Sequence, residues 1–375
     1  MAGKKRAAPS RSPSPDGPPP PKFHFPSVRR GQALVDTYTF HSVDAATGAD
    51  VEGKGKGREI DIPVVEGEWM LGVDEAGRGP ALGPQVYGVA FCKLEYSDQL
   101  KEMGFAGEFT ASSFPRFTLT DPLREELFKQ ILEHADDVKY AATIMSPNDI
   151  SMGMLRKTPY NLNAQSHDCT INLIREVCDR GYKLKQCYVD TVGPAADYQA
   201  KLSSFFPTID FTVTSKADAL FPIVSAASIV AKVTRDRILD EWVFAEPGIG
   251  AGTNEAADES DAAGEEKDED EEAAADTARL FGSGYPSDPK TVAWLQTNFD
   301  PIFGFPNVAR FSWAPVKNAL LKKGVASKWN DEPATIQKYF APDAAAKGGP
   351  AAAQAPLWKD LNLVSVGDLA LWFDP

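Results

Sequence analysis

Cysteine is scarce in this sequence, with four residues in 375. They lie at positions 92, 169, 178 and 187, and no two of them form the C-x-x-C pair typical of zinc ribbons and redox motifs. A disulfide framework and a structural zinc site are therefore not expected, and a reducing intracellular compartment is favoured.

Long hydrophobic runs are also missing. No apolar stretch approaches the roughly 18 to 20 residues of a membrane span, and the first residues lack the apolar core of a secretory signal. The short basic cluster Lys4-Lys5-Arg6 is compatible with nuclear import and is also typical of a solvated tail. We therefore expect an intracellular protein with no membrane partner.

Basic residues are outnumbered, and the net charge is -14. An evenly spread negative charge would argue against binding to nucleic acid. However, residues 255–276 contain twelve acidic residues and one lysine, so this segment carries -11 and the rest of the chain only -3. A basic groove facing phosphates is thus not excluded.

Composition divides the chain into five segments. Residues 1–30 are rich in Pro, Ser and Ala and predict a disordered tail, and residues 246–278 predict an acidic disordered insertion. Residues 68–245 carry the patterns of an α/β domain, and residues 279–340 those of a helical C-terminal subdomain. Residues 341–375 are a linker and a tail of unknown order, in which the apolar pattern fits a core element, a partner-binding segment or a translation artefact.

Strand and helix patterns alternate within the central domain. We expect strands over 69–74, 85–94, 138–145, 186–190 and 209–214. We expect helices from residue 121 onward and over 163–180, 194–205 and 222–242. This alternation predicts an α/β fold.

Two adjacent carboxylates, Asp74 and Glu75, end the first strand pattern and precede Gly77-Arg78-Gly79. Buried like charges repel unless they are protonated or bound to a cation. An arginine between two glycines indicates backbone that a ligand can approach closely, with exposed N–H groups for an anion.

Two further carboxylates follow later in the chain. Asp190 ends another apolar strand, and Asp218 precedes the long helix pattern. Because strand ends gather along one edge of a twisted α/β sheet, Asp74, Glu75, Asp190 and Asp218 can converge. Oxygen ligands alone favour Mg²⁺ or Mn²⁺.

Such a site suits phosphodiester hydrolysis. Two divalent ions about 3.5–4 Å apart stabilise the attacking and leaving oxygens of an in-line displacement at phosphorus. From spacing alone, capped or solvated turns at the strand ends remain an alternative to a metal site, and Asp218 also fits a surface residue.

Several longer motifs resemble the catalytic large subunit of eukaryotic type 2 ribonuclease H, in the ribonuclease HII family. They are DEAGRGP at 74–80, YNLN at 160–163 with SHD at 166–168, YVDTVG at 188–193, KADALFPIVSAAS at 216–228, GSGYPSDPKT at 282–291 and RFSW at 310–313. The similarity extends from about residue 69 to about residue 317 and is interrupted by the acidic insertion.

The resemblance implies a ribonuclease-H-like mixed sheet flanked by helices. It implies hydrolysis of RNA in RNA–DNA hybrids and cleavage 5′ of single ribonucleotides in duplex DNA, leaving 3′-hydroxyl and 5′-phosphate ends. It implies a nuclear protein of DNA replication and repair. The four carboxylates would be catalytic and would bind two Mg²⁺ or Mn²⁺ ions. Gly77, Arg78 and Gly79 would contact the ribonucleotide and its 2′-hydroxyl, and Tyr285 would pack against the sugar.

Other polar residues are less specific. Lys216, Lys232 and Arg310 could meet phosphates or be solvated or ion-paired, and His167 is expected to be a structural histidine.

The sequence departs from the family pattern at residues 107–117. The family has Asp-Ser-Lys before a Thr-Leu pair, and its lysine lies near the scissile phosphate. Here an unrelated segment precedes Thr118-Leu119, and no lysine occurs between Lys101 and Lys129. Either this is a mis-joined exon, or the chain is a catalytically impaired nucleic-acid-binding or scaffold subunit.

Partners follow from the same resemblance. Two smaller, non-catalytic subunits would complete a heterotrimer, docking on the surface after Arg310. Ile336, Tyr339 and Phe340 are similar to part of a sliding-clamp-binding motif, although Pro333 stands where the motif has glutamine.

Overall fold

The computed structural model describes residues 25–47, 65–105, 121–246 and 281–326. The expected tail up to residue 24, the 107–117 segment, the acidic insertion beyond residue 246 and the clamp-like motif at Ile336, Tyr339 and Phe340 lie outside the described residues. Contacts divide the chain into Met1–Gly324 and Val325–Pro375, and the described residues belong to the first unit except for 325 and 326.

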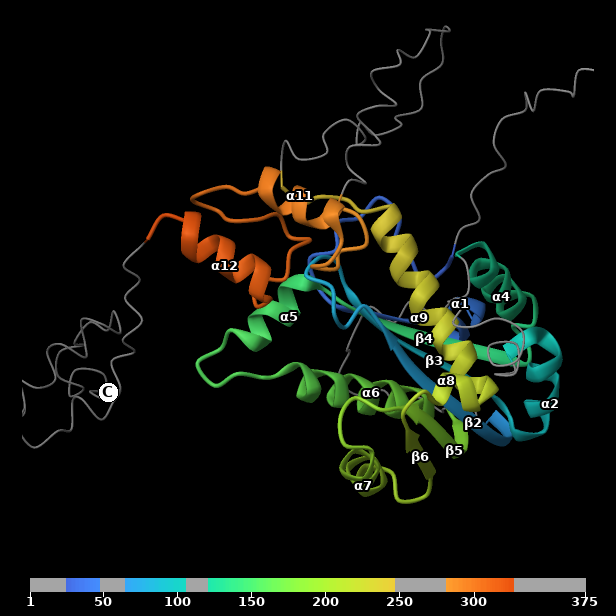
Figure 1. The fold of residues 1–375 in the computed structure, drawn as a ribbon. Coiled ribbons are helices and arrows are strands. Elements are labelled where there is room, and N and C mark those ends of the chain that lie inside the picture. The colour runs from blue at the N-terminus through green and yellow to red at the C-terminus, as the bar shows by residue number, and fades with distance from the viewer. Residues whose placement is uncertain (1–24, 48–64, 106–120, 247–280, 327–375) are drawn as a thin grey trace, which may run out of the picture. The chain divides into compact units, whose positions relative to one another are not determined.

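A six-stranded mixed sheet forms the centre of this unit (Figure 1). Its strands are β1 (Tyr38–His41), β2 (Val65–Ala76), β3 (Gln85–Lys93), β4 (Val138–Met145), β5 (Tyr182–Asp190) and β6 (Asp210–Thr214). The strand order is β1-β4-β3-β2-β5-β6. Strands β1 to β4 pair antiparallel, whereas β5 pairs parallel with β2 and with β6. The mixed sheet confirms the predicted fold class.

Helices surround the sheet and extend the unit at one end. They are α1 (Ser42–Thr47), α2 (Ser97–Leu100), α4 (Asp121–Glu133), α5 (Pro147–Met154), α6 (Leu162–Asp179), α7 (Ala195–Phe205), α8 (Ala217–Leu220), α9 (Pro222–Asp240), α11 (Pro289–Thr297) and α12 (Ala314–Lys323). A 3₁₀ turn, η1 (Leu94–Tyr96), and a π turn, η2 (Lys101–Phe105), flank α2. Across the described ranges, none of these helices has the length and apolarity needed to cross a bilayer.

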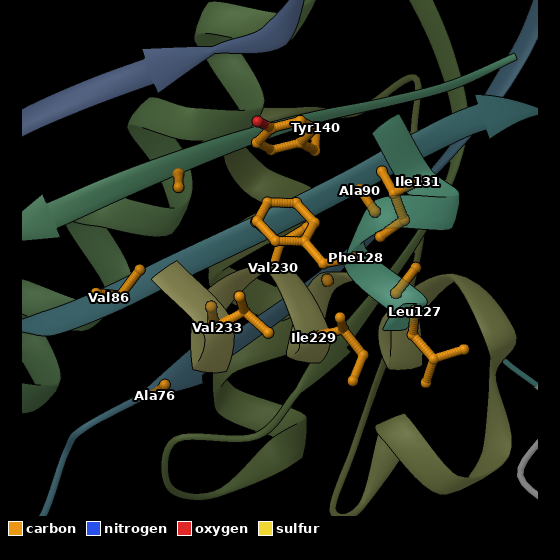
Figure 2. Close-up of a cluster of buried hydrophobic side chains, with 14 of the residues drawn as sticks. Ala76, Val86, Ala90, Leu127, Phe128, Ile131, Tyr140, Ile229, Val230 and Val233 are labelled. Atoms are coloured by element: carbon orange, nitrogen blue, oxygen red, sulfur yellow. The ribbon is translucent and has the colours of Figure 1, made fainter. Parts of the chain in front are cut away.

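The long helix α9 covers one face of the sheet, with α4 packed beside it (Figure 1). Figure 2 shows this core, in which Phe128 and Ile131 of α4 lie with Ile229 and Val230 of α9. The α9 sequence provides apolar residues over most of its surface, because it packs on the sheet and on α4 together.

Two glycines bring α9 very close to the sheet. A Cβ at Gly72 of β2 would lie 2.4 Å from the carbonyl oxygen of Ile223, and one at Gly88 of β3 would lie 2.5 Å from that of Ala227. Any larger residue would push the helix outward. This close approach brings the α9 side chains Ser228 and Lys232 to the end of β2.

The opposite face is covered by α6 and α7, which bury a second cluster that includes Ile174 and Leu202. A third cluster belongs to the C-terminal helices α11 and α12. It joins Trp294 and Val316 to Ala81 and Leu82, which follow the end of β2. The C-terminal residues therefore pack directly on the loop after β2.

The N-terminal part differs from the sequence prediction. Residues 25–30 were expected to be disordered, yet Phe25 is buried and stacks on Phe128 with ring centroids 4.9 Å apart. Strand β1 was not predicted. It is short, and only its pairing with β4, about a hundred residues later, gives it a place in the sheet.

Candidate active site

Three of the predicted carboxylates lie at the end of two neighbouring strands. Asp74 and Glu75 are among the last residues of β2, and Asp190 is the last residue of β5. The strands run parallel, and Val73 is opposite Val189. The residues that follow each valine are therefore side by side on one edge of the sheet.

Asp74 is the most buried of these carboxylates, with 6% of its surface exposed. Burial raises its pKa to about 6, although a hydrogen bond from Ser228 and the charge of Lys232 act in the opposite direction. Both of these residues come from α9. The close packing of α9 on Gly72 therefore partly compensates a carboxylate that is costly to bury.

Glu75 and Asp190 share this unfavourable electrostatic environment. Burial, and next the negative charge of Asp74, raise the pKa of Glu75 to about 8. Burial also raises the pKa of Asp190, and the charge of Asp218 adds to the effect. Each carboxylate thus repels the next, and the group lacks enough positive charge to balance it.

Asp218 approaches this group through a backbone contact. Asp190 Oδ1 accepts a hydrogen bond of 3.0 Å from the N–H of Ala217, which begins α8. Lys216 before it adopts a left-handed φ of 57°, which sets the direction of the helix. Lys232 Nζ lies 4.0 Å from Asp218 Oδ2, so this lysine serves the carboxylates rather than standing free.

The chemistry of this donor set fits a hard divalent cation. The side chains are four carboxylates without His or Cys, and two of them have strongly raised pKa values because positive charge is lacking. Among the described residues, no group of three or more His, Cys, Asp or Glu side chains is arranged so that it could hold a metal ion as it stands. The donors are gathered at one edge, but their present orientations do not form a finished coordination shell.

The loop Gly77-Arg78-Gly79 begins directly after these carboxylates. Gly77 has a φ of 81°, a conformation that favours glycine, and a Cβ there would clash with Arg235 of α9. The Arg78 guanidinium donates to Ser166 Oγ at 3.1 Å and to the side-chain oxygen of Asn163. Helix α6 therefore fixes the arginine side chain beside the carboxylate edge.

Tyr285 lies on the other side of this loop. A Cβ at Gly79 would be 3.1 Å from Cε1 of the Tyr285 ring, and 42% of the tyrosine surface is exposed. The turn that carries it is held by Asp288, whose Oδ2 accepts bonds from the Ser283 N–H and hydroxyl at 2.8 and 2.7 Å. The structure thus brings Tyr285 and the loop together, as the sequence predicted.

A groove of about 580 Å³ extends from these residues along α9. Its walls include Glu75, Gly77, Lys232 and Tyr285. It is open to solvent, and it joins the carboxylate edge to the tyrosine.

Sequence reasoning missed part of the site's framework. Arg310 was considered for phosphate binding, but it is completely buried and donates to three backbone carbonyls, so that use was wrong. Arg235 and Trp313 were not singled out, although the RFSW motif contains the tryptophan. His167 stacks on Tyr198 at 4.0 Å, in keeping with a structural histidine.

Comparisons with known proteins agree with this geometry. The family model described as Ribonuclease HII matches residues 71–261. The chain is 42% identical over 279 residues to the large subunit of ribonuclease H2 from Rattus norvegicus, and the match covers 72% of this chain and 81% of that protein. It is 43% identical over 244 residues to the corresponding ribonuclease H2 protein of Arabidopsis thaliana, covering 65% and 71%. The crystal structure of the ribonuclease H2 from Pyrococcus horikoshii OT3 is similar with a TM-score of 0.48 and 26% identity, covering 68% of this chain and 98% of that one.

Proposed function

This chain belongs to the ribonuclease HII family, and on that basis we propose that it is the catalytic subunit of a type 2 ribonuclease H. It is an endoribonuclease that cleaves RNA in RNA–DNA hybrids. Its finer activity is to cut duplex DNA on the 5′ side of a single ribonucleotide, leaving 3′-hydroxyl and 5′-phosphate ends.

The observation that carries this proposal is the convergence of Asp74, Glu75 and Asp190 at one sheet edge with raised pKa values. With Asp218 they hold divalent metal, Mg²⁺ or Mn²⁺, as a two-ion site. Such ions supply charge stabilisation for the phosphoryl group and a more acidic bound water. Ser228 and Lys232 orient Asp74 and Asp218 toward this task.

Substrate selection belongs to the adjoining loop. Gly77, Arg78 and Gly79 contact the ribonucleotide, since the 2′-hydroxyl is the group that distinguishes RNA from DNA. Tyr285 stacks against the sugar from the far side of the loop. Support comes from the short distance between Gly79 and the exposed Tyr285 ring, which leaves one narrow place for a sugar beside the carboxylates.

The catalytic subunit works with two smaller, non-catalytic subunits in a nuclear heterotrimer. The surface after Arg310 receives them, and its helix α12 exposes 76% of Leu321. An exposed leucine of this kind is typical of an interface. The sliding-clamp contact through Ile336, Tyr339 and Phe340 is a separate, weaker element of the proposal.

The test is cleavage of a labelled DNA duplex that contains one ribonucleotide, in Mg²⁺, by the chain assembled with its partner subunits. We expect one cut, 5′ of the ribonucleotide, which Asp74→Asn abolishes. Asp210→Asn is the matched control, because this aspartate is exposed at the start of β6 and away from the carboxylate edge. A folded, assembled complex that does not cut would refute the catalytic assignment and favour the impaired subunit suggested by residues 107–117.

A further inference from the structure

Two buried arginines lie directly behind the loop Gly77-Arg78-Gly79. Arg310 is 0% exposed and Arg235 is 6% exposed. Charged side chains are rarely buried to this extent unless a carboxylate pairs with them. Here the main partners are backbone carbonyls, so the burial of two positive charges needs an explanation.

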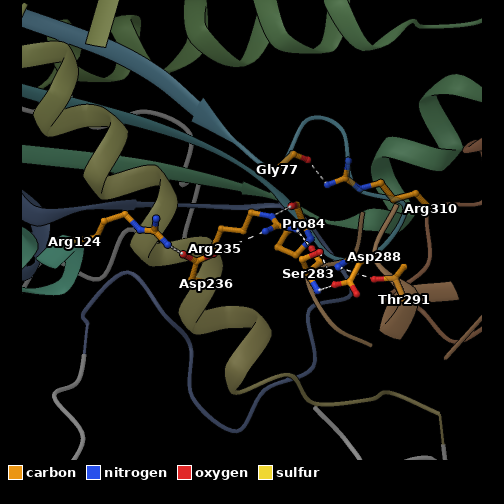
Figure 3. Close-up of polar contacts among 10 residues, drawn as sticks. Gly77, Pro84, Arg124, Arg235, Asp236, Ser283, Asp288, Thr291 and Arg310 are labelled. Carbon is orange, nitrogen blue, oxygen red and sulfur yellow. Dashed lines mark hydrogen bonds and ion pairs between the residues drawn. The ribbon is translucent and has the colours of Figure 1, made fainter. Parts of the chain in front are cut away.

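Arg310 bonds to the loop itself, as Figure 3 shows for Gly77. Its Nη2 donates to the carbonyl oxygen of Gly77 at 2.6 Å, and its Nη1 donates to that of Arg78 at 3.2 Å. Its Nε donates to Gly83 at 2.8 Å. Burial, and next the charge of Arg235, lower the pKa of Arg310 to about 9.

Arg235 supports the loop from α9. Its Nε lies against Gly77 and donates to the carbonyl oxygen of Pro84 at 3.3 Å, and its Nη2 donates to that of Ser283 at 3.4 Å (Figure 3). Asp236 is 3.8 Å from its Nη1 and also accepts a bond of 2.9 Å from Arg124. The positive charge beside the loop is therefore only partly balanced.

Trp313 completes the contacts to the loop. Its Nε1–H donates to the carbonyl oxygen of Gly79 at 3.0 Å, and the Arg310 guanidinium lies 4.8 Å from the centre of its ring. Three consecutive carbonyls are thus fixed by two side chains that are more than two hundred residues away in sequence.

The direction of these carbonyls sets the direction of the neighbouring N–H groups. In a trans peptide the C=O and the following N–H point opposite ways. The N–H groups of Arg78 and Gly79 therefore point away from Arg310. Within the described part of the chain neither has a hydrogen-bond partner. Two adjacent N–H groups with positive charge behind them are suited to bind an electronegative oxygen.

We infer that Arg310, Arg235 and Trp313 are positioning residues for sugar selection, which hold the Arg78 and Gly79 N–H groups toward the 2′-oxygen of a ribonucleotide. This inference rests on the proposed function and extends it to residues that do not touch the substrate. The alternative is that the same bonds only attach the C-terminal residues to the sheet.

The two explanations differ in the ratio of two dissociation constants. Selection is measured as Kd for an all-DNA duplex divided by Kd for the same duplex with one ribonucleotide, by fluorescence anisotropy in Mg²⁺. The assembled complex carries Asp218→Asn throughout, so that the substrate stays intact. A loss of stability alone changes the active fraction and the saturation level, but it leaves this ratio unchanged.

Trp313→Phe is the decisive variant, because it keeps a ring and removes one donor. Trp294→Phe is its matched control, since this tryptophan is buried in the third cluster and bonds to none of the loop carbonyls. We expect Trp313→Phe to lower the ratio about fivefold, the effect of one hydrogen bond, with Kd for all-DNA duplex unchanged. Arg310→Lys should lower it further, and Trp294→Phe should preserve it.

The outcomes distinguish failure of the positioning role from failure of the proposed function. A parent complex that binds both duplexes equally would refute ribonucleotide recognition itself. A selective parent whose selection survives Trp313→Phe would overturn the positioning role. Equal weakening toward both duplexes would also overturn it. If Arg310→Lys does not fold, Trp313→Phe alone decides.

Discussion

Adding one methyl group at Gly72 should damage both stability and activity. Gly72 has an ordinary φ, so alanine is compatible with its backbone, and the only obstacle is α9. The new Cβ would lie 2.4 Å from Ile223 O, 2.5 Å from Ile223 C and 2.7 Å from Val224 N. These atoms are backbone and cannot rotate away.

The required movement gives the magnitude. Restoring ordinary contact distances requires α9 to retreat by about 1 Å, and overpacking of this kind costs about 2–3 kcal/mol of unfolding free energy. The same retreat moves Ser228 and Lys232 away from Asp74. A misplacement of about 1 Å near reacting groups reduces turnover about 100-fold.

Both effects can be measured on one preparation. Urea unfolding of the chain gives the free energy, and cleavage of the one-ribonucleotide duplex by the assembled complex gives kcat. Glu68→Ala is the control, since it is exposed in the same strand and its contacts to Lys183 and Lys185 are 3.8 and 3.6 Å long at the surface. It should change stability by less than about 1 kcal/mol. Wild-type stability and kcat in Gly72→Ala would refute the close-packing argument.

Three further predictions address the metal site, the N-terminus and the interface. Asp190→Asn should weaken Mg²⁺ binding in calorimetry at least tenfold, and undiminished binding would remove Asp190 from the ligand set. Phe25→Ala should cost about 3–5 kcal/mol in urea unfolding, because the ring is 2% exposed and stacked on Phe128; a loss under about 1 kcal/mol would contradict this packing. Leu321→Asp should impair trimer assembly in size-exclusion chromatography without unfolding the chain, whereas Leu123→Asp, exposed on α4, should not; an intact Leu321→Asp trimer would exclude α12 from the interface.

The sequence was sufficient where local patterns carry the information. Strands that end in carboxylates predicted the sheet edge at Asp74 and Asp190, and the structure has both at neighbouring strand ends. The helix pattern over 222–242 predicted α9, because its apolar residues and its opening proline are local features.

The sequence was insufficient where distant segments meet. Phe25 follows a proline-rich stretch, and only its contact with Phe128 shows that it belongs to the core. Arg310 has the composition of a phosphate ligand, and only its bonds to Gly77 and Arg78 reveal a buried role. Such long-range contacts leave no periodic pattern in either segment.

The separation between the loop and its supports has a consequence for synthesis on the ribosome. The strands and α9, which gather the four carboxylates, are complete once Asp240 has emerged. Arg310 follows about 70 residues later, which corresponds to roughly 4 to 14 seconds of elongation. During that interval the nascent chain carries its acidic edge without the groups that orient the loop. The capacity for hydrolysis is therefore encoded ahead of the means to choose a substrate, and docking of the C-terminal residues is the event that joins the two.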